Sequence, residues 1–236
     1  MSRPSIRRAL RRAGVETPPR APRSSGSGNL GRIPPPRIFL PGEPADAGPV
    51  DFSAVFGRVA PVEMEIGVGK GSFLLAAAAA RADRNWFGLE IEPEYAEIVR
   101  FRAARAELSN LRVERLDGKA FVTRRLSAGC LAGLHVYFPD PWPKKRHHKR
   151  RLVDAAWAEA AARALAPACF FRVASDHKDY FALIDDVLSS EPLLEKLMPE
   201  EAGDWSTGTS YELKFRKTGR PIYKAVFRRR ASGSAS

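Results

Sequence analysis

Short apolar runs alternate with longer stretches of mixed apolar and polar residues through the middle of the chain. The apolar runs predict strands at 62–68, 86–91, 111–116, 131–138 and 169–174, with later strands near 194–198 and 222–228. The mixed stretches predict helices at 71–81, 94–108, 119–126, 151–165 and 180–188. Strands that alternate with helices form βαβ units, which build a parallel sheet covered on both faces. We therefore predict an α/β fold with a doubly wound, mostly parallel, seven-stranded sheet.

The two ends of the chain lack this pattern. Residues 1–50 are rich in Pro, Gly, Ser and Arg, and such a segment buries too little apolar surface to offset the entropy lost on ordering. The sequence predicts a flexible basic arm over 1–50, a folded domain over 51–230 and a disordered tail over 231–236. The arginines of the arm could contact nucleic acid or serve only solubility.

Charge points to an acidic partner. The 236 residues carry a formal net charge of +12, and the isoelectric point is near 10.1. Nucleic acid is the first candidate and an anionic membrane the second. No apolar run reaches the length of a membrane span or a signal peptide. Cys130 and Cys169 lie far apart without a Cys-x-x-Cys partner, so neither a disulfide framework nor a metal site is predicted, and a reducing cytoplasm fits.

Glycines and acids follow the first three predicted strands, where ligands bind in a parallel sheet. Gly67 and Gly69 form a turn that lets a ligand approach the backbone. Glu65, near the end of a buried strand, needs a partner and suits an ammonium or sulfonium group. Glu90 is placed to accept ribose hydroxyls, and Asp117 lies where an adenine would lie. Each acid alone could be a helix N-cap, but together they predict a pocket for S-adenosylmethionine rather than NAD.

The fourth predicted strand leads into Phe-Pro-Asp-Pro-Trp-Pro-Lys-Lys-Arg-His-His-Lys-Arg-Arg over 138–151. Its prolines restrict the backbone of Asp140, and the eight basic or histidine residues that end it attract phosphate. Such a run can also be only a solvated loop. Asp176, after the fifth strand, is either a helix N-cap or a neighbour of the substrate. Residues 208–215 are predicted to form a polar loop, or alternatively an edge strand or hairpin, and its Tyr211 could stack on a base.

Five motifs together carry a family resemblance: Glu-Ile-Gly-x-Gly-x-Gly at 65–71, Gly-Leu-Glu at 88–90, the segment 138–151, Ser-Asp at 175–176, and Thr-Ser-Tyr-Glu-x-Lys-Phe at 209–215. Over about residues 60–228 the chain resembles the bacterial tRNA (guanine-N7-)-methyltransferases. The proline-rich arm lies outside that pattern, and Gly118 stands where an alanine is commoner.

The resemblance implies a Rossmann-like methyltransferase that transfers a methyl group from S-adenosylmethionine to N7 of the guanine at position 46, in the variable loop of tRNA. By position, the implied cofactor contacts are Glu65, Gly67, Gly69, Glu90, Asp117 and Asp140, and Asp140 is also the implied active-site acid. The implied substrate contacts are Lys144, Asp176, Thr209, Ser210, Tyr211 and Glu212.

Other functions stay open at this point. One is a basic RNA-binding module with an inactive methyltransferase fold, and another is methylation of a different base nitrogen or of a protein. The sequence does not distinguish a monomer from a homodimer.

Overall fold

The computed structural model describes residues 48–202 and 207–231. The predicted arm therefore lies almost wholly outside the described residues, and so does the predicted tail apart from residue 231. The first described residues are anchored to the domain, because the backbone amide of Val50 donates to the carbonyl of Arg125 (2.8 Å). A short helix, α2 (Phe52–Phe56), follows, with Asp51 as its N-cap.

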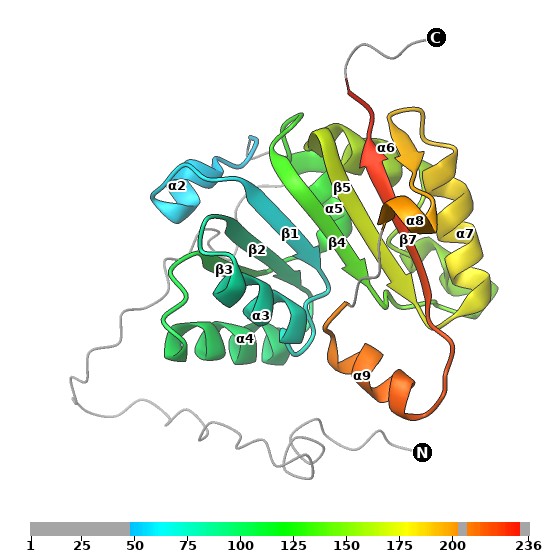
Figure 1. Cartoon of the computed structure of the whole chain (residues 1–236), viewed down its shortest axis with the longest axis horizontal. Coiled ribbons are helices and arrows are strands. Elements are labelled where there is room, and N and C mark those ends of the chain that lie inside the picture. Colours follow the sequence, from blue (N-terminus) through cyan, green and yellow to red (C-terminus); the bar gives the residue numbers. More distant parts are fainter. Residues whose placement is uncertain (1–47, 203–206, 232–236) are drawn as a thin grey trace. The chain divides into compact units, whose positions relative to one another are not determined.

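The described strands form one sheet in the order β3-β2-β1-β4-β5-β7-β6 (Figure 1). Their bounds are β1 Val62–Ile66, β2 Asn85–Glu90, β3 Leu111–Arg115, β4 Leu131–Tyr137, β5 Leu165–Ser175, β6 Leu194–Lys196 and β7 Tyr223–Arg229. Strands β1 to β5 are parallel neighbours, whereas β7 runs antiparallel between β5 and β6. The predicted seven-stranded, mostly parallel sheet is confirmed.

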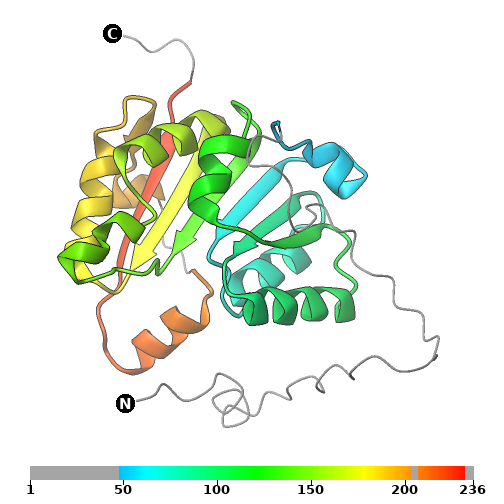
Figure 2. The ribbon, with the colours of Figure 1, turned by 180° about the vertical axis from the view of Figure 1, so that it is seen from behind.

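Helices cover both faces of the sheet. On one face lie α3 (Ser72–Ala80) and α4 (Pro93–Arg105), packed over β2 and β3. On the other lie α5 (Gly118–Arg125), α6 (Ala155–Ala164) and α7 (Lys178–Ser189), seen from behind in Figure 2. The larger core fills the second face, where Trp157 of α6 packs edge-on against Phe171 of β5. Apolar burial of this kind is the main force that holds helices on a sheet.

Three segments differ from the prediction. The helix expected over 151–165 begins only at Ala155, because the side chain of Asp154 caps it by accepting from the amide of Trp157. Strand β5 begins at Leu165, earlier than expected, and a register shift in its pairing with β4 accommodates Pro167. The basic run forms a 3₁₀ helix, η1 (Lys145–Arg150).

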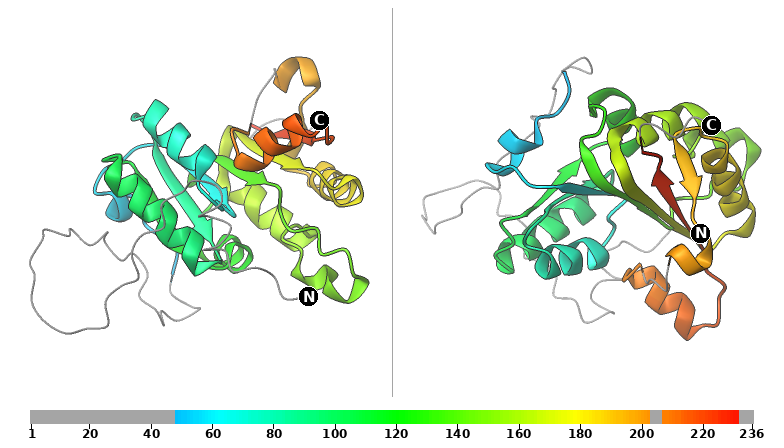
Figure 3. Two further views of the ribbon diagram at one scale, coloured as in Figure 1. Left: turned by 90° about the horizontal axis from the view of Figure 1, so that it is seen from below. Right: turned by 45° about the horizontal axis from the view of Figure 1, so that its top comes forward.

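The prediction of a polar loop over 208–215 is wrong, and the alternative of a strand is wrong as well. Residues Ser210–Lys217 form helix α9, and a short helix α8 (Pro199–Ala202) precedes it. Two further views show α9 beyond the carboxyl ends of β4 and β5 (Figure 3). Helix α9 therefore faces the sheet edge where ligands bind in this architecture.

Candidate active site

The turn between β1 and α3 leaves its backbone open. Gly67 (φ 78°) and Gly69 (φ 51°) adopt left-handed conformations, and a Cβ added at either would meet no atom within 4 Å. The amide of Gly67 donates to the carbonyl of Leu89 (2.8 Å), which fixes the turn against β2. At Gly71 (φ 72°) the reason for glycine is different, because a Cβ would lie 2.7 Å from the methyl groups of Val99. The turn therefore packs tightly against α4 at Gly71, whereas a ligand could approach the backbone at Gly67 and Gly69.

Glu65 is a buried carboxyl without a partner on one oxygen. Its residue exposure is 2%, and no described group forms a hydrogen bond with its Oε2. Burial raises the pKa of Glu65 well above its ordinary value, and the negative charge of Glu90 raises that pKa further. A cation placed beside this carboxyl would stabilise its ionised form.

Glu90 and Asp117 both bind backbone amides. The Glu90 carboxylate accepts from the amides of Gly69 (2.7 Å) and Glu92 (2.9 Å), so it ties the glycine turn to the end of β2. Asp117 is exposed and caps α5 by accepting from the amides of Lys119 and Ala120. Asp117 is therefore a helix N-cap, as in the alternative interpretation. Contact of Glu90 or Asp117 with a cofactor stays a prediction.

The loop after β4 holds Asp140 between two strained residues. Phe138 (φ 53°) and Trp142 (φ 41°) lie in the left-handed region, which costs non-glycine residues about 1–3 kcal/mol each. The loop is tied down at both ends. The amide of Phe138 donates to the carbonyl of Ala174 (2.7 Å), and Nε of Arg151 donates to the carbonyl of Pro141 (2.9 Å). Asp140 is exposed at the centre of a loop with little freedom.

Tyr211 of α9 brings three strand ends together. Its ring lies 5.8 Å from that of Phe138, centroid to centroid. Burial raises the pKa of the Tyr211 phenol, and the charges of Asp140, Glu90 and Asp176 raise it further. Acids at the ends of β4, β2 and β5 thus act electrostatically on one phenol, and the ring contact with Phe138 places that phenol beside the loop after β4.

Helix α9 begins in a buried polar cap. Thr209 is its N-cap and accepts from the amide of Glu212 (3.1 Å). Glu212 is 1% exposed and accepts from the hydroxyl of Thr207 (2.6 Å) and from Arg216 (2.7 Å). These contacts orient the first turn of α9, and substrate contact by Thr209 and Glu212 stays a prediction.

Ser210 links the two halves of the site. Its hydroxyl lies 2.6 Å from that of Ser72, the first residue of α3 after the glycine turn. The helix that carries Tyr211 is thereby joined directly to the turn between β1 and α3.

Asp176 is not the N-cap of α7, since His177 occupies that position and accepts from the amide of Tyr180 (3.3 Å). Instead, Asp176 pairs with Arg220 at 3.2 Å. Lys144 is exposed at the N-cap of η1, where its ammonium can reach an external anion. The ion pair with Arg220 gives Asp176 a structural role, and substrate contact by Asp176 and Lys144 stays a prediction.

The basic run has two different sides. Residues three apart in a 3₁₀ helix lie on the same side. His147 and Arg150 accordingly both contact Trp142, with ring centroids 5.8 Å apart and the guanidinium 4.9 Å from the ring. Lys145, Arg146 and Lys149 are exposed. Part of the run therefore holds the loop, while the rest is available to a partner.

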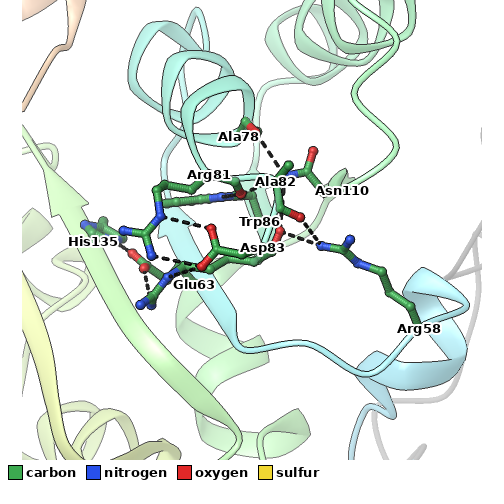
Figure 4. A network of polar contacts seen from close by, with 10 residues as sticks. Arg58, Glu63, Ala78, Arg81, Ala82, Asp83, Trp86, Asn110 and His135 are labelled. Carbon is green, nitrogen blue, oxygen red and sulfur yellow. Dashed lines mark hydrogen bonds and ion pairs between the residues drawn. The ribbon is translucent and has the colours of Figure 1, made fainter.

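Sequence reasoning missed a buried polar chain beside the site. His135 of β4 contacts Glu63 of β1 through Nε2 (2.8 Å) and the hydroxyl of Tyr137 through Nδ1 (2.8 Å). Figure 4 shows Glu63 and His135 within a larger polar network. Burial raises the pKa of Tyr137 well above its ordinary value, as does the charge of Glu65. Polar residues at alternate positions of two buried strands were the available signal.

Comparison with known proteins decides the family. A family model described as "Putative methyltransferase" matches residues 59–225. The tRNA (guanine-N(7)-)-methyltransferase of Thiobacillus denitrificans is 37% identical over 197 residues, which cover 83% of this chain and 86% of that protein. The chain belongs to the tRNA (guanine-N7-)-methyltransferase family. The Chromobacterium violaceum member is 38% identical over 184 residues, covering 77% of this chain and 81% of its own length.

Solved structures confirm the fold of this family member as Rossmann-like. The 16S rRNA methyltransferase KamB superimposes with a TM-score of 0.52 at 17% identity, over 76% of this chain and 93% of that one. A 16S rRNA (adenine(1408)-N(1))-methyltransferase from Catenulisporales acidiphilia, solved with its cosubstrate SAM, gives 0.53 at 12% identity, over 84% and 97% of the two chains. At these identities the likeness concerns the fold alone.

Within 48–202 and 207–231, no helix combines the length and apolarity needed to cross a bilayer. In the same ranges, no group of three or more His, Cys, Asp or Glu residues is placed to hold a metal ion.

Proposed function

We propose that this methyltransferase transfers the methyl group of S-adenosylmethionine to N7 of the guanine at position 46, in the variable loop of tRNA. The observation that carries the proposal is the ring contact of Tyr211 with Phe138, two residues before Asp140, on a helix that Ser210 joins to the open glycine turn. The names of the relatives supply the target nitrogen and the class of RNA. Cytoplasmic tRNA is the proposed partner, and the cytoplasm the proposed location.

The residues at the glycine turn fit S-adenosylmethionine. That molecule would supply a methyl group on a positively charged sulfur. Glu65 offers a buried carboxyl oxygen with no hydrogen-bond donor among the described residues, which suits the positive charge. Glu90 binds two amides, but a carboxylate has about four lone-pair sites, which leaves capacity for ribose hydroxyls. Gly67 and Gly69 leave the space that the ligand needs, and Asp117 lies at the neighbouring strand end.

Asp140 is the proposed catalytic carboxylate. Guanine N7 has an in-plane lone pair and no proton, so no general base is needed to expose the nucleophile. Rate then depends on alignment of the reacting atoms. We expect Asp140 to accept hydrogen bonds from N1–H and the 2-amino group of the guanine, a pair of donors that adenine lacks. The same contacts offset the positive charge that develops on the ring as N7 is alkylated.

Asp176 and the first turn of α9 are proposed to complete the substrate site. Asp176 lies near the same phenol as Asp140, and Tyr211 is 53% exposed, so its ring is accessible to a base. Stacking on an aromatic ring is worth about 1–3 kcal/mol per base. Ser210, Thr209 and Glu212 fix that turn. Lys144 and the exposed Lys145 and Arg146 bind the tRNA backbone.

The test uses Asp140→Asn, which keeps the shape of the side chain and removes its charge. Its matched control is Asp179→Asn, an exposed acid on α7 outside the site. Turnover on a tRNA transcript should fall by about 100-fold or more in Asp140→Asn and stay unchanged in the control. The affinity for S-adenosylmethionine, measured by calorimetry, should change less than about threefold. Wild-type turnover in Asp140→Asn would contradict the proposed role.

A second arm tests the position of the methyl group. A transcript with adenine in place of guanine at position 46 should accept no methyl group from the wild-type enzyme. Labelling at another nucleotide would show that the proposed position is wrong, whatever the outcome with Asp140→Asn.

A further inference from the structure

A cavity of about 320 Å³ lies apart from the acids around Tyr211. It is bounded by η1, the starts of α5 and α6, and α7, elements seen from behind in Figure 2. Its volume is at the lower end of the range of ligand-binding pockets. None of the residues assigned above to cofactor or guanine lines it.

One side of the cavity is apolar. Val153, Ala155, Leu183 and Val187 form this side. Leu183 is 36% exposed, which leaves a large apolar side chain at the edge of the most basic segment of the chain. An exposed apolar surface with a polar rim is typical of a binding site.

The opposite side is cationic. Lys119, His148, Lys149 and Arg151 contribute to it, together with Asp154. Asp154 does not make the cavity acidic, because its Oδ2 lies 2.5 Å from the ammonium of Lys119. The charge that remains comes from η1 and Arg151, and it favours an anion.

The end of η1 brings His148 and Arg151 to one side of the cavity. Arg151 is the C-cap of η1, three residues after His148, and its amide donates to the carbonyl of His148 (2.9 Å). Arg151 also donates to the carbonyl of Pro141, the residue after Asp140. The cavity is therefore connected by one side chain to the loop of the proposed catalytic carboxylate.

We infer that this cavity is a second tRNA-binding site, which takes a phosphodiester and its sugar from a segment outside the methylated nucleotide. The cations of η1 pair with the phosphate, and the apolar side packs against the sugar. A nucleic acid fits better than a neutral ligand, since the cavity opens beside the exposed cations of η1 in a chain of charge +12. The inference rests on tRNA as the partner in the proposed function.

Leu183→Asp tests the apolar side, because it replaces the surface that packs against the sugar with a negative charge close to the phosphodiester. Val59→Asp is the matched control, since Val59 is 92% exposed before the amino end of β1, far along the strand from the ligand-binding edge. Filter binding with full-length tRNA should show a dissociation constant raised about 10-fold or more in Leu183→Asp and unchanged in the control. The affinity for S-adenosylmethionine should be the same in both variants.

Lys149→Gln tests the cationic side at an exposed position that does not support the fold. The slope of log affinity against log salt concentration should become shallower by about one unit or slightly less. This variant keeps the inference testable if Leu183→Asp fails to fold, which its melting temperature would reveal.

Wild-type tRNA affinity in Leu183→Asp, together with an unchanged salt slope in Lys149→Gln, would overturn the inference and leave the cavity to a protein partner. That outcome is distinct from failure of the proposed function. If the inference alone is wrong, the wild-type enzyme still methylates position 46. If the proposed function is wrong, it does not.

Discussion

Glu65→Gln should stabilise the ligand-free protein and weaken its binding of S-adenosylmethionine. The folded-state pKa of Glu65 lies well above the ordinary 4.5, because burial and the charge of Glu90 disfavour ionisation. The stability associated with a raised pKa is fully present below 4.5 and is lost as the pH rises through the folded-state value. Glutamine has a similar shape and does not titrate, so the variant escapes this loss.

The magnitude follows from linkage. Each pH unit between 4.5 and the folded-state pKa of Glu65 costs the wild type about 1.4 kcal/mol. For a domain of this size, 1 kcal/mol corresponds to about 2–4 °C in melting temperature. The difference between Glu65→Gln and wild type should therefore increase by about 3–5 °C per pH unit and level off at the folded-state pKa.

Cofactor binding should respond in the opposite direction. A bound cation stabilises the Glu65 carboxylate and lowers its pKa, so binding releases a proton at a pH between the bound and the ligand-free pKa of Glu65. The variant cannot supply that charge. A buried hydrogen bond to a charged group contributes about 1.5–3 kcal/mol, which predicts a loss of affinity of about 10- to 100-fold. Calorimetry in two buffers with different ionisation enthalpies would detect the released proton in the wild type alone.

Glu63→Gln is the control on the same face of the same strand. Glu63 contacts His135 (2.8 Å) and Arg84 (2.7 Å), and although burial opposes its ionisation, these partners and Arg172 lower its pKa. This variant should lose about 1–3 kcal/mol at neutral pH and keep its cofactor affinity. The reasoning would be refuted by a difference between Glu65→Gln and wild type that does not vary with pH, or by an unchanged affinity for S-adenosylmethionine.

Three further predictions concern packing, coupling and acid sensitivity. Gly71→Ala should cost about 2–4 kcal/mol in denaturant unfolding, because its Cβ would lie 2.7 Å from Val99 at a φ of 72°, and Val99→Ala in the same protein should recover part of the loss. Ser72→Ala and Ser210→Ala should show a coupling of about 0.5–1.5 kcal/mol in a double-mutant cycle of stability, whereas additive effects would mean that their hydroxyls do not interact. Burial lowers the pKa of His135, so its contribution to stability is present above pH 6.5 and is lost as the pH falls. His135→Gln should give a flatter stability profile below pH 6.5 in thermal scans, and an equally steep profile would contradict this.

The strands were predictable because each is an apolar run too short for a buried helix, and the runs alternate with longer mixed stretches. Strand β4, predicted over 131–138, spans Leu131–Tyr137. The place of the acids followed from the same pattern, since the carboxyl ends of parallel strands lie at one edge of the sheet. Helix α9 was not predicted, because its eight residues are mostly charged or aromatic. Its Thr-x-x-Glu start is a recognised capping signature and was the missed signal.

Contacts between distant segments could not be predicted. Nothing in the sequence pairs Ser72 with Ser210, which lie 138 positions apart. The same holds for the pair of His135 with Glu63, 72 positions away. Likewise, the contacts of His147 and Arg150 with Trp142 depend on the three-residue period of a 3₁₀ helix. A run of charged residues does not indicate whether it will form a 3₁₀ helix or an α-helix.

The buried hydrogen bonds that join Glu63, His135 and Tyr137 limit which substitutions this sequence can accept during evolution. Replacing one member leaves a buried donor or acceptor unpaired, which costs about 1–3 kcal/mol, a large share of the stability of an ordinary domain. Replacing the whole set with apolar residues of similar volume can be neutral. We therefore expect the three positions to change together among descendants of this protein, with single replacements removed by selection and a lasting record of their contact left as correlated substitutions.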